Sequence, residues 1–435
     1  MSAAASASKG SAAQGIAALM APKSVAIIGA SADPSRIGGR PIATMLRAGF
    51  KGTIYPVNPN RAEIQGIKAY ASVADLPETP DAAIIAVPGS QALAAIEALG
   101  QRGTSAAVIF SSGFAEIGKE GAAAQAQLLA AARRHGMRLL GPNCLGLFNA
   151  PLGWYPIFST AFDGGWPKAG RTAMISQSGA FGSYLVSLAR ERGLGTPIGI
   201  TTGNEADLTV GDAIQWCVDS PDVDVIMAYA EGIKSADTFV AALAAAQGAR
   251  KPVIVMKVGT SELGHGAAQS HTASVAGDDA VTDAVLAEFG ALRVSSAEQL
   301  LDFAEAATRR IYPAHNSLGV LTISGGVGVQ ISDAAESLGL PMPAMPDASQ
   351  AKLKALLPYS APRNPVDCTA QAVNDPALLQ AFGEEMLSCG GYQSVLAFFA
   401  QLTSATGIGD KLLADMTAMA AGHAGTLFAV VGMMK

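Results

Sequence analysis

The chain has 435 residues, half of them hydrophobic and 15% charged, with a formal net charge of −6. This length predicts two or three domains with large cores, and the acidic balance gives no electrostatic basis for binding nucleic acid. The mean hydropathy is positive, +0.30, but apolar runs such as 25–28 and 82–87 are far shorter than the ~20 residues of a spanning helix. We therefore expect buried parallel strands and no association with a membrane.

The beginning of the chain and the cysteines indicate a protein of the cytoplasm. Residues 1–15 are rich in Ala, Ser and Gly and lack the basic start and apolar core of a signal peptide, so we expect residues 1–19 to form a disordered tail. The four cysteines lie far apart, without a CxxC pair, at positions 144, 217, 368 and 389. This spacing favours reduced thiols and predicts no metal site.

Strand-like and helix-like segments alternate along nearly the whole chain, which is typical of α/β proteins with doubly wound parallel sheets. We expect three α/β domains of related design. The second and third open alike, each with a buried strand, a turn of small residues and a helix, in MISQSGAFG (174–182) and TISGGVGVQ (322–330). The predicted organisation is a first domain over 20–148, a linker over 149–170, a second domain over 171–312 and a third over 316–435.

The first strand ends in a glycine-rich turn, GASADPSRIGG, over Gly29–Gly39. Glycine allows a ligand to approach the backbone, and the following helix start offers free N–H groups to a phosphate. NAD is disfavoured, because the second strand ends in Val57-Asn58-Pro59-Asn60 without the acidic residue that holds the ribose. We expect a different nucleotide-bearing ligand; the alternative is a Rossmann turn that binds nothing.

Ser176-Gln177-Ser178-Gly179 lies where the first strand of the second domain meets a helix. Its backbone amides and two hydroxyls are suited to bind an anion. By itself the pattern is weak, since serine at a helix start often serves only as a cap.

A long loop of small residues over 260–277 carries two histidines, His265 and His271. Loops of this length inside α/β units tend to be functional or disordered. Glu231 follows the preceding strand, and in a parallel sheet both segments emerge at the carboxyl edge, where ligands bind. A carboxylate that holds one imidazole nitrogen makes the other a better nucleophile. We therefore interpret a histidine of this loop and Glu231 as a catalytic pair, with the turn at Ser176–Gly179 as its phosphate site. The alternative is that the histidines are structural or simply exposed.

The sequence resembles the NDP-forming (ADP-forming) acyl-CoA synthetases, relatives of succinyl-CoA synthetase, from about residue 20 to its end. The resemblance rests on an ordered set of segments: GASADPSRIG, YPVNPN, AVP, SSGFAE, GPNCLG, SQSGAFG, GNEAD, YAEGI, KVGTSELGHGAAQSHTASVAG and NPVD. It implies a Rossmann-like CoA-binding domain followed by two flavodoxin-like domains. It also implies a phosphohistidine at His271, an orienting carboxylate at Glu231 and a phosphate-binding helix start at Ser176, Gln177, Ser178 and Gly179. The coenzyme A pocket would contain Gly29, Ser31, Gly38, Asn58 and Pro88.

By this resemblance, ATP with Mg²⁺ phosphorylates His271, a carboxylic acid takes the phosphoryl group as an acyl phosphate, and the thiol of coenzyme A forms the thioester. Two departures matter. The family usually has SHTG where this chain has Ala273, and no ATP-grasp module is present. We expect that module, with its metal site, in a separate subunit or beyond Lys435, and we expect the working enzyme to be an oligomer.

Two other functions stay open at this point. A non-catalytic CoA-binding regulatory module would use the same fold, although retention of His271 and Glu231 argues against it. An NAD-dependent oxidoreductase rests on the first turn alone. The acid is not readable: the aromatic segment 154–162 (WYPIFSTAF) could line an acyl pocket, but packing within the core is the favoured interpretation.

Overall fold

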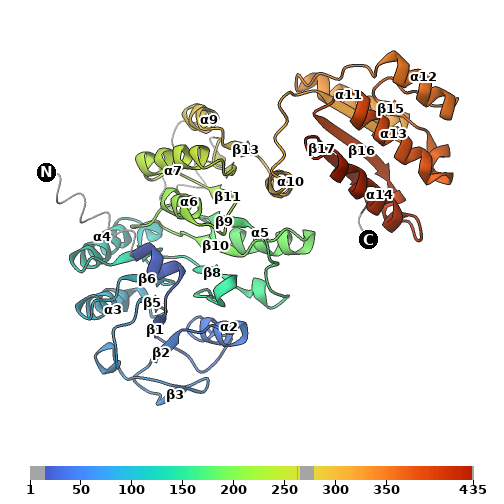
Figure 1. Cartoon of the computed structure of the whole chain (residues 1–435). Coiled ribbons are helices and arrows are strands. Elements are labelled where there is room, and N and C mark those ends of the chain that lie inside the picture. Colours follow the sequence, from blue (N-terminus) through green and yellow to red (C-terminus); the bar gives the residue numbers. More distant parts are fainter. Residues whose placement is uncertain (1–14, 262, 265–278, 434–435) are drawn as a thin grey trace. The chain divides into compact units, whose positions relative to one another are not determined.

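The computed structural model describes residues 15–261, 263–264 and 279–433. The chain divides into two compact units, residues 1–308 and 309–435, which Figure 1 shows. Within the described residues, the first unit has two large, mainly parallel sheets and a small antiparallel sheet of two strands, and the second unit has one parallel sheet.

The first sheet has five parallel strands in the order β2-β1-β5-β6-β7. The apolar strands are buried almost throughout, as expected where helices cover both faces of a parallel sheet. The elements are β1 (Ser24–Ile28), α2 (Arg40–Ala48), β2 (Thr53–Val57), β3 (Glu63–Ile64), β4 (Ile67–Lys68), β5 (Ala82–Ile85), α3 (Gly89–Gln101), β6 (Ala106–Ile109), α4 (Lys119–Arg134) and β7 (Arg138–Leu140).

The second sheet has the order β13-β12-β11-β9-β10-β8, and only β8 runs antiparallel to its neighbour. β8 pairs with β10, although most of it falls within the predicted first domain. The elements are β8 (Leu147–Asn149), β9 (Thr172–Ser176), α5 (Gly179–Arg192), β10 (Ile198–Thr201), α6 (Val210–Asp219), β11 (Val225–Ala230), α7 (Ala236–Gly248), β12 (Val253–Lys257), α9 (Asp279–Glu288), β13 (Leu292–Val294) and α10 (Ala297–Thr308).

The aromatic segment between these two sheets is part of the core. Trp154, Tyr155 and Phe162 are buried, and Tyr155 stacks on Phe148 with ring centroids 5.8 Å apart. The indole Nε1 of Trp154 donates to the carbonyl oxygen of Leu19 at 2.7 Å. These contacts agree with packing as the favoured interpretation of the segment, and they join the first two domains through one continuous cluster of buried side chains.

The expectation of a disordered tail is wrong for residues 15–19. Residues 15–20 form a helical turn, in which Leu19 and Met20 are each only 2% exposed. Burial of these apolar side chains stabilises the turn.

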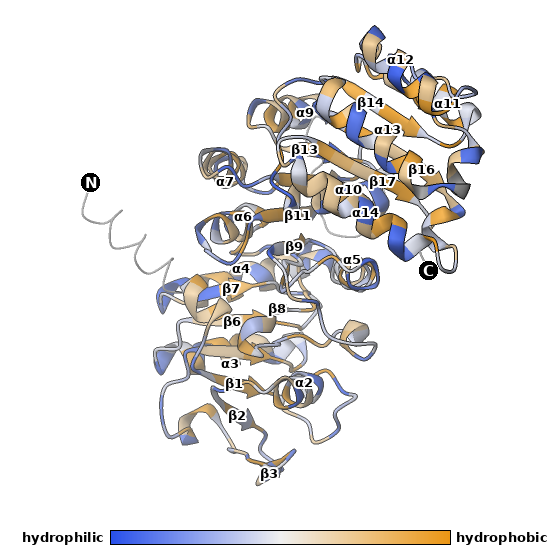
Figure 2. Cartoon of the chain, turned by 45° about the vertical axis from the view of Figure 1, so that its right-hand side comes forward, coloured by the Kyte–Doolittle hydropathy of each residue, from blue (hydrophilic) through white to orange (hydrophobic). Residues whose placement is uncertain are grey.

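The second unit contains four parallel strands in the order β15-β14-β16-β17. Its elements are β14 (Leu318–Thr322), α11 (Gly325–Ser337), α12 (Asp347–Leu356), β15 (Val366–Asp367), α13 (Pro376–Cys389), β16 (Ser394–Ala400), α14 (Gly409–Gly422) and β17 (Leu427–Gly432). Figure 2 shows hydrophobic colours along strands of the three large sheets and mixed colours on the helices. Among the described residues, no helix combines the length and apolar character needed to span a bilayer.

Numbered in chain order, the parallel strands of the first two sheets follow the order 2-1-3-4-5, and those of the third follow 2-1-3-4. In this doubly wound arrangement, ligands bind at the carboxyl ends of strands 1 and 3, where the chain direction switches. The corresponding pairs are β1 and β5, β9 and β11, and β14 and β16. We therefore expect the ligand sites at the turns that follow these strands.

Candidate active site

An open pocket of about 760 Å³ lies at the switch point of the first sheet. Four of the five residues expected to bind coenzyme A line it: Gly29, Ser31, Gly38 and Asn58. Pro88 is not among the lining residues; it precedes the first residue of α3, and Ala86 faces the pocket instead.

The glycines of this pocket are required by close backbone approach. Gly29 has φ = +85°, and a Cβ there would lie 2.7 Å from the carbonyl oxygen of Ala86. A Cβ on Gly38 would lie only 2.1 Å from the carbonyl oxygen of Gly29. The Asn58 amide fixes the turn by donating to the carbonyl oxygen of Ala30 at 2.9 Å. These contacts hold the turn in the tightly folded form that lines the pocket, and only glycine fits at either position.

Two arginines give the pocket a positive edge that sequence analysis did not single out. Arg36 and Arg61 line the pocket, and guanidinium groups are well suited to bind phosphate. Asp33 faces the same space, with its pKa held below its usual range by hydrogen bonds from the Ser35 hydroxyl and backbone N–H. These charges are exposed and compatible with a phosphorylated ligand.

The predicted phosphate turn lies at the switch point of the second sheet, between β9 and α5. Ser178 is the N-cap of α5 and accepts a hydrogen bond from the N–H of Phe181 at 3.3 Å, while the Ser176 hydroxyl donates to the Ser178 carbonyl at 2.6 Å. Both hydroxyls therefore also support the turn itself. The N–H groups at the start of α5, from Gly179 onward, face the carboxyl edge of the sheet, where an anion is stabilised by the helix dipole.

Gln177 connects this turn to the neighbouring strand β11 and the turn after it. Its N–H donates to the Tyr229 carbonyl at 3.1 Å. Its side-chain Oε1 accepts from the N–H groups of Glu231 and Gly232, at 2.5 and 3.0 Å, and its Nε2 donates to the Gly232 carbonyl at 2.6 Å. Gln177 thus ties the phosphate turn to the turn that carries Glu231.

Glu231 is a buried carboxylate directly after β11. Its Oε2 has no hydrogen-bond partner within the part of the chain that the structure describes. An unpaired buried carboxylate oxygen is costly, so a partner is expected at this position. Burial, together with the charge of Glu231, raises the pKa of the neighbouring Tyr229 to about 12.

His271 and His265 both lie outside the described residues. β12, which precedes their segment, pairs directly with β11. The Lys257 ammonium at the end of β12 donates to the Glu231 carbonyl oxygen at 2.9 Å, and burial lowers the pKa of Lys257. The loop that carries the histidines therefore begins beside Glu231.

A second buried carboxylate, Glu205, lies next to this site and was not singled out as a site residue by sequence analysis. It belongs to the loop 202–207, which follows β10, and has φ = +53°. Its Oε1 accepts from the Thr202 hydroxyl and from the N–H of Val210, both at 2.9 Å. Its Oε2 is buried without a partner among the described residues. Burial raises the pKa of Glu205 to about 7.

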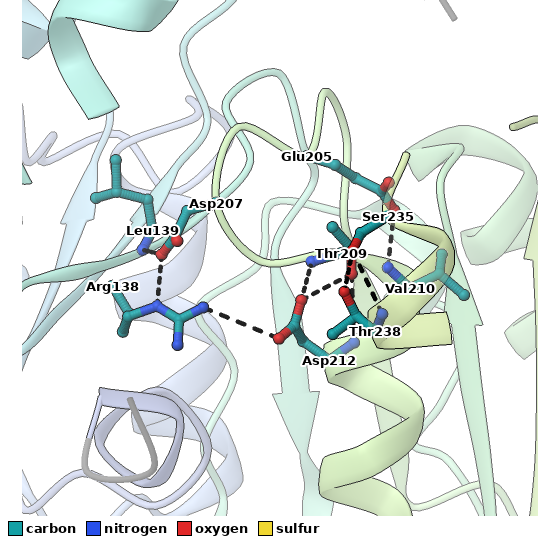
Figure 3. A network of polar contacts seen from close by, with 9 residues as sticks. All are labelled: Arg138, Leu139, Glu205, Asp207, Thr209, Val210, Asp212, Ser235 and Thr238. Atoms are coloured by element: carbon teal, nitrogen blue, oxygen red, sulfur yellow. Dashed lines mark hydrogen bonds and ion pairs between the residues drawn. The ribbon is translucent and has the colours of Figure 1, made fainter. Parts of the chain in front are cut away.

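The loop 202–207 also joins the two α/β domains of the first unit, as Figure 3 shows. Arg138 at the start of β7 donates from Nε to Asp207 at 2.6 Å, and its other end lies 4.0 Å from Asp212 in the first turn of α6. At the other end of the loop, Asn204 donates to Glu116 and to Gln125 of the first domain at 2.5 and 3.1 Å. The loop is therefore fixed on both sides.

Fold and site together define a CoA-binding domain joined to a flavodoxin-like domain of the succinyl-CoA ligase kind. Residues 23–150 match the CoA binding domain, and residues 169–307 match the succinyl-CoA ligase like flavodoxin domain. The chain belongs to the ADP-forming acyl-CoA synthetase family, as the relatives below show.

The alpha subunit of acetate–CoA ligase (ADP-forming) I from Pyrococcus furiosus is 37% identical over 82% of this chain and 77% of its own. Trans-feruloyl-CoA synthase FCS1 from an unknown prokaryotic organism is 38% identical over 83% of this chain, which spans about half (51%) of that relative's length. Among solved structures, the dinucleotide-forming acetyl-coenzyme A synthetase 1 of Ca. Korarchaeum cryptofilum, in complex with phosphate and ADP, superposes with a TM-score of 0.86. It is 31% identical, with 96% of this chain and 88% of that chain covered.

Proposed function

We propose that this chain is the CoA-binding, acyl-transferring part of an ADP-forming acyl-CoA synthetase, and that His271 carries the phosphoryl group. The observation that carries the proposal is the buried Oε2 of Glu231, which has no hydrogen-bond partner among the described residues. It lies at the switch point of the second sheet, on a turn that Gln177 joins to the start of α5. A carboxylate in this position suits an imidazole that must be oriented and kept nucleophilic.

The proposed reaction proceeds in three steps. An imidazole nitrogen of His271 attacks the γ-phosphorus of ATP; the bond to the β-phosphate oxygen breaks, and ADP leaves. A substrate carboxylate then attacks this phosphorus, the N–P bond breaks, and an acyl phosphate forms. Finally the CoA thiolate attacks the acyl carbon, the C–O bond to phosphate breaks, and inorganic phosphate leaves with its charge stabilised at the start of α5.

The first step needs a second protein component. We propose an ATP-grasp domain or subunit that binds ATP with Mg²⁺, because sequence analysis finds no such module in this chain. One relative is itself described as an alpha subunit, which supports an assembly of unlike subunits. The described cysteines are free thiols, which supports a reducing compartment, the cytoplasm.

The pocket of the first domain supports coenzyme A as the thiol substrate. Gly29 and Gly38 line it in a turn that admits no side chain at either position, and Arg36 and Arg61 at the same pocket are suited to bind its phosphates. The acid is left to experiment: the relatives are described as acting on acetate, ferulate and 4-hydroxybutyrate.

The last two steps can be tested in reverse with this chain alone. Acetyl, 4-hydroxybutyryl and feruloyl thioesters of CoA are each supplied with [³²P]phosphate. We expect acid-labile, base-stable label on the protein in the presence of at least one thioester. His271→Ala abolishes the label and His265→Ala, from the same segment, retains it.

Equal labelling of His271→Ala and the wild type would overturn the assignment of the phosphohistidine. Tight binding of CoA without labelling, both with these thioesters and with ATP plus an ATP-grasp partner, would instead indicate a regulatory CoA-binding module.

A further inference from the structure

A buried asparagine, Asn204, lies where the two domains of the first unit meet and has no role in the three steps above. It is only 1% exposed. Its Nδ2 donates to Glu116 and Gln125, at 2.5 and 3.1 Å, and its Oδ1 accepts from the Nδ2 of Asn143 at 3.2 Å. All three partners belong to the CoA-binding domain, whereas Asn204 belongs to the flavodoxin-like domain. Every polar atom of this side chain is therefore used in contacts between the domains.

The backbone of Asn204 leads to the proposed phosphohistidine site. Its carbonyl oxygen accepts from the Lys234 ammonium at 2.5 Å. Lys234 lies in the turn after β11, as the third residue beyond Glu231. Gln177 ties the same turn to the start of α5. A change of the Asn204 side chain therefore removes its contacts with the CoA-binding domain and keeps the backbone contact with Lys234.

Hydrogen bonds also lead from Asn204 to the switch point of the first sheet. Its partner Asn143 donates from the backbone N–H to the Ser111 carbonyl at 2.9 Å. The Ser111 hydroxyl donates in turn to the Val87 carbonyl at 2.5 Å. Val87 follows Ala86, which lines the pocket proposed for coenzyme A. A continuous series of hydrogen bonds thus joins the edge of this pocket to the turn that carries Glu231.

Glu116 fixes the loop after β6 for its contact with Asn204. Its Oε1 accepts from the N–H groups of Gly113 and Phe114, at 2.6 and 3.2 Å, while its Oε2 accepts from the Asn204 amide. Burial by itself would raise the pKa of Glu116, but the hydrogen bonds from Asn204 and the backbone lower it below its usual value. The carboxylate is therefore ionised at neutral pH and can only accept, so the residue opposite it must donate.

We propose that Asn204 is a positioning residue for the thioester step, in which the CoA thiolate attacks the acyl carbon and phosphate leaves. Asn204 fixes the loops at the edge of the CoA-binding sheet relative to the Glu231 turn, so that thiolate and acyl phosphate meet. Such placement matters because a displacement of about 1 Å can slow a reaction on the order of 100-fold. This inference rests on the proposed function, since it concerns the same reaction.

The test compares two reactions in the wild type and in Asn204→Ala. Both start from the ³²P-labelled acyl phosphate of whichever acid (acetic, 4-hydroxybutyric or ferulic) gave label on the wild type. The first reaction is labelling of the protein without CoA, and the second is formation of acyl-CoA at saturating CoA. In Asn204→Ala we expect acyl-CoA formation to be at least about tenfold slower, with the KM for CoA and the labelling rate close to those of the wild type. Unaltered acyl-CoA formation, or equal slowing of both reactions, would overturn the proposal.

An exchange of donor and acceptor separates positioning from a loss of stability. Asn204→Asp places a second acceptor against the Glu116 carboxylate and should slow acyl-CoA formation. Glu116→Gln alone should also slow it, because two amide donors then face each other. The double variant restores a donor opposite an acceptor, and Oε1 of the new glutamine can still accept from the N–H groups of Gly113 and Phe114. It should recover most of the lost rate, whereas additive losses would contradict the proposal.

The exchange decides alone if Asn204→Ala does not fold, since its substitutions preserve the shape of both side chains. The matched control is Asn149→Ala, which removes another buried asparagine, one whose Nδ2 donates to the Met20 carbonyl at 3.0 Å. This variant should leave the ratio of the two rates unchanged, and a similar fall in the ratio would overturn the proposal. Absence of any histidine label in the wild type would defeat the proposed function itself. Normal labelling with unaltered acyl-CoA formation in Asn204→Ala would defeat only this inference.

Discussion

Arg138 of the CoA-binding domain and Asp207 of the flavodoxin-like domain form a nearly buried ion pair, with Nε and Oδ2 2.6 Å apart and side-chain exposures of 17% and 10%. The same Asp207 oxygen accepts the N–H of Leu139 at 3.0 Å. Because a pair this sheltered has few competing contacts with water, loss of one partner leaves a buried charge uncompensated. The pair therefore holds together the two domains whose chemistry must be coordinated.

Arg138→Met should lower the free energy of unfolding of the first unit by about 2–4 kcal/mol, because it leaves Asp207 buried without its cation. Urea denaturation measures this loss. The matched control is Arg192→Met, which removes the more exposed pair with Asp302 (32% and 63%) and should cost under about 1 kcal/mol. Equal losses in the two variants would show that the domain contact is no stronger than an ordinary surface pair.

Gly38→Ala should weaken CoA binding at least about tenfold, or ~1.4 kcal/mol. The added Cβ would lie 2.1 Å from the Gly29 carbonyl oxygen, so the phosphate-facing turn must open. Calorimetric titration with CoA checks the effect. Gly248→Ala is the control, since a Cβ there meets no atom of the described chain within 4 Å and should leave the affinity unchanged. Unaltered affinity in Gly38→Ala would place CoA elsewhere.

The residue pattern of the strands explains why the residues of the candidate site could be predicted to share one sheet edge. Apolar runs bounded by small residues predicted parallel strands, and the carboxyl ends of such strands meet at one edge. The register bears this out, since Ser176 pairs with Tyr229, two residues before Glu231. The similar openings of the second and third domains are also confirmed in detail: the Thr322 hydroxyl donates to the Ser324 carbonyl at 3.0 Å, as the Ser176 hydroxyl does to that of Ser178.

The contributions of Glu205 and Arg138 could not be predicted in this way. Arg138 and Asp207 lie 69 residues apart, and neither belongs to a local pattern that indicates a partner. Glu205 is buried with its backbone at positive φ, in a loop that backbone hydrogen bonds attach to another domain. The helical turn at residues 15–19 was missed for a related reason: its stability comes from packing against distant residues such as Trp154 and not from local composition.

Glu231→Gln should reduce phosphohistidine formation by about 100-fold or more, by analogy with carboxylates that orient a catalytic histidine. Thermal stability should be unchanged or higher, because a neutral amide is less costly to bury than a carboxylate whose Oε2 has no partner among the described residues. Labelling rates and calorimetric melting temperatures test the two parts separately. A fall in melting temperature that accounts for the lost label would assign Glu231 to the fold instead.

Burial raises the pKa of Glu205 from the ordinary glutamate value of 4.5 to about 7, which predicts how stability depends on pH. Between these values the folded state binds more protons than the unfolded state, so the free energy of unfolding decreases as pH rises and levels off above about 7. The contribution of this one group is up to about 3 kcal/mol. Glu205→Gln has no such titration, and its stability curve should fall less steeply than that of the wild type from pH 5 to pH 7. Urea denaturation at pH 5, 6, 7 and 8 measures both curves, and parallel curves would mean that Glu205 is already ionised in the folded protein at pH 5.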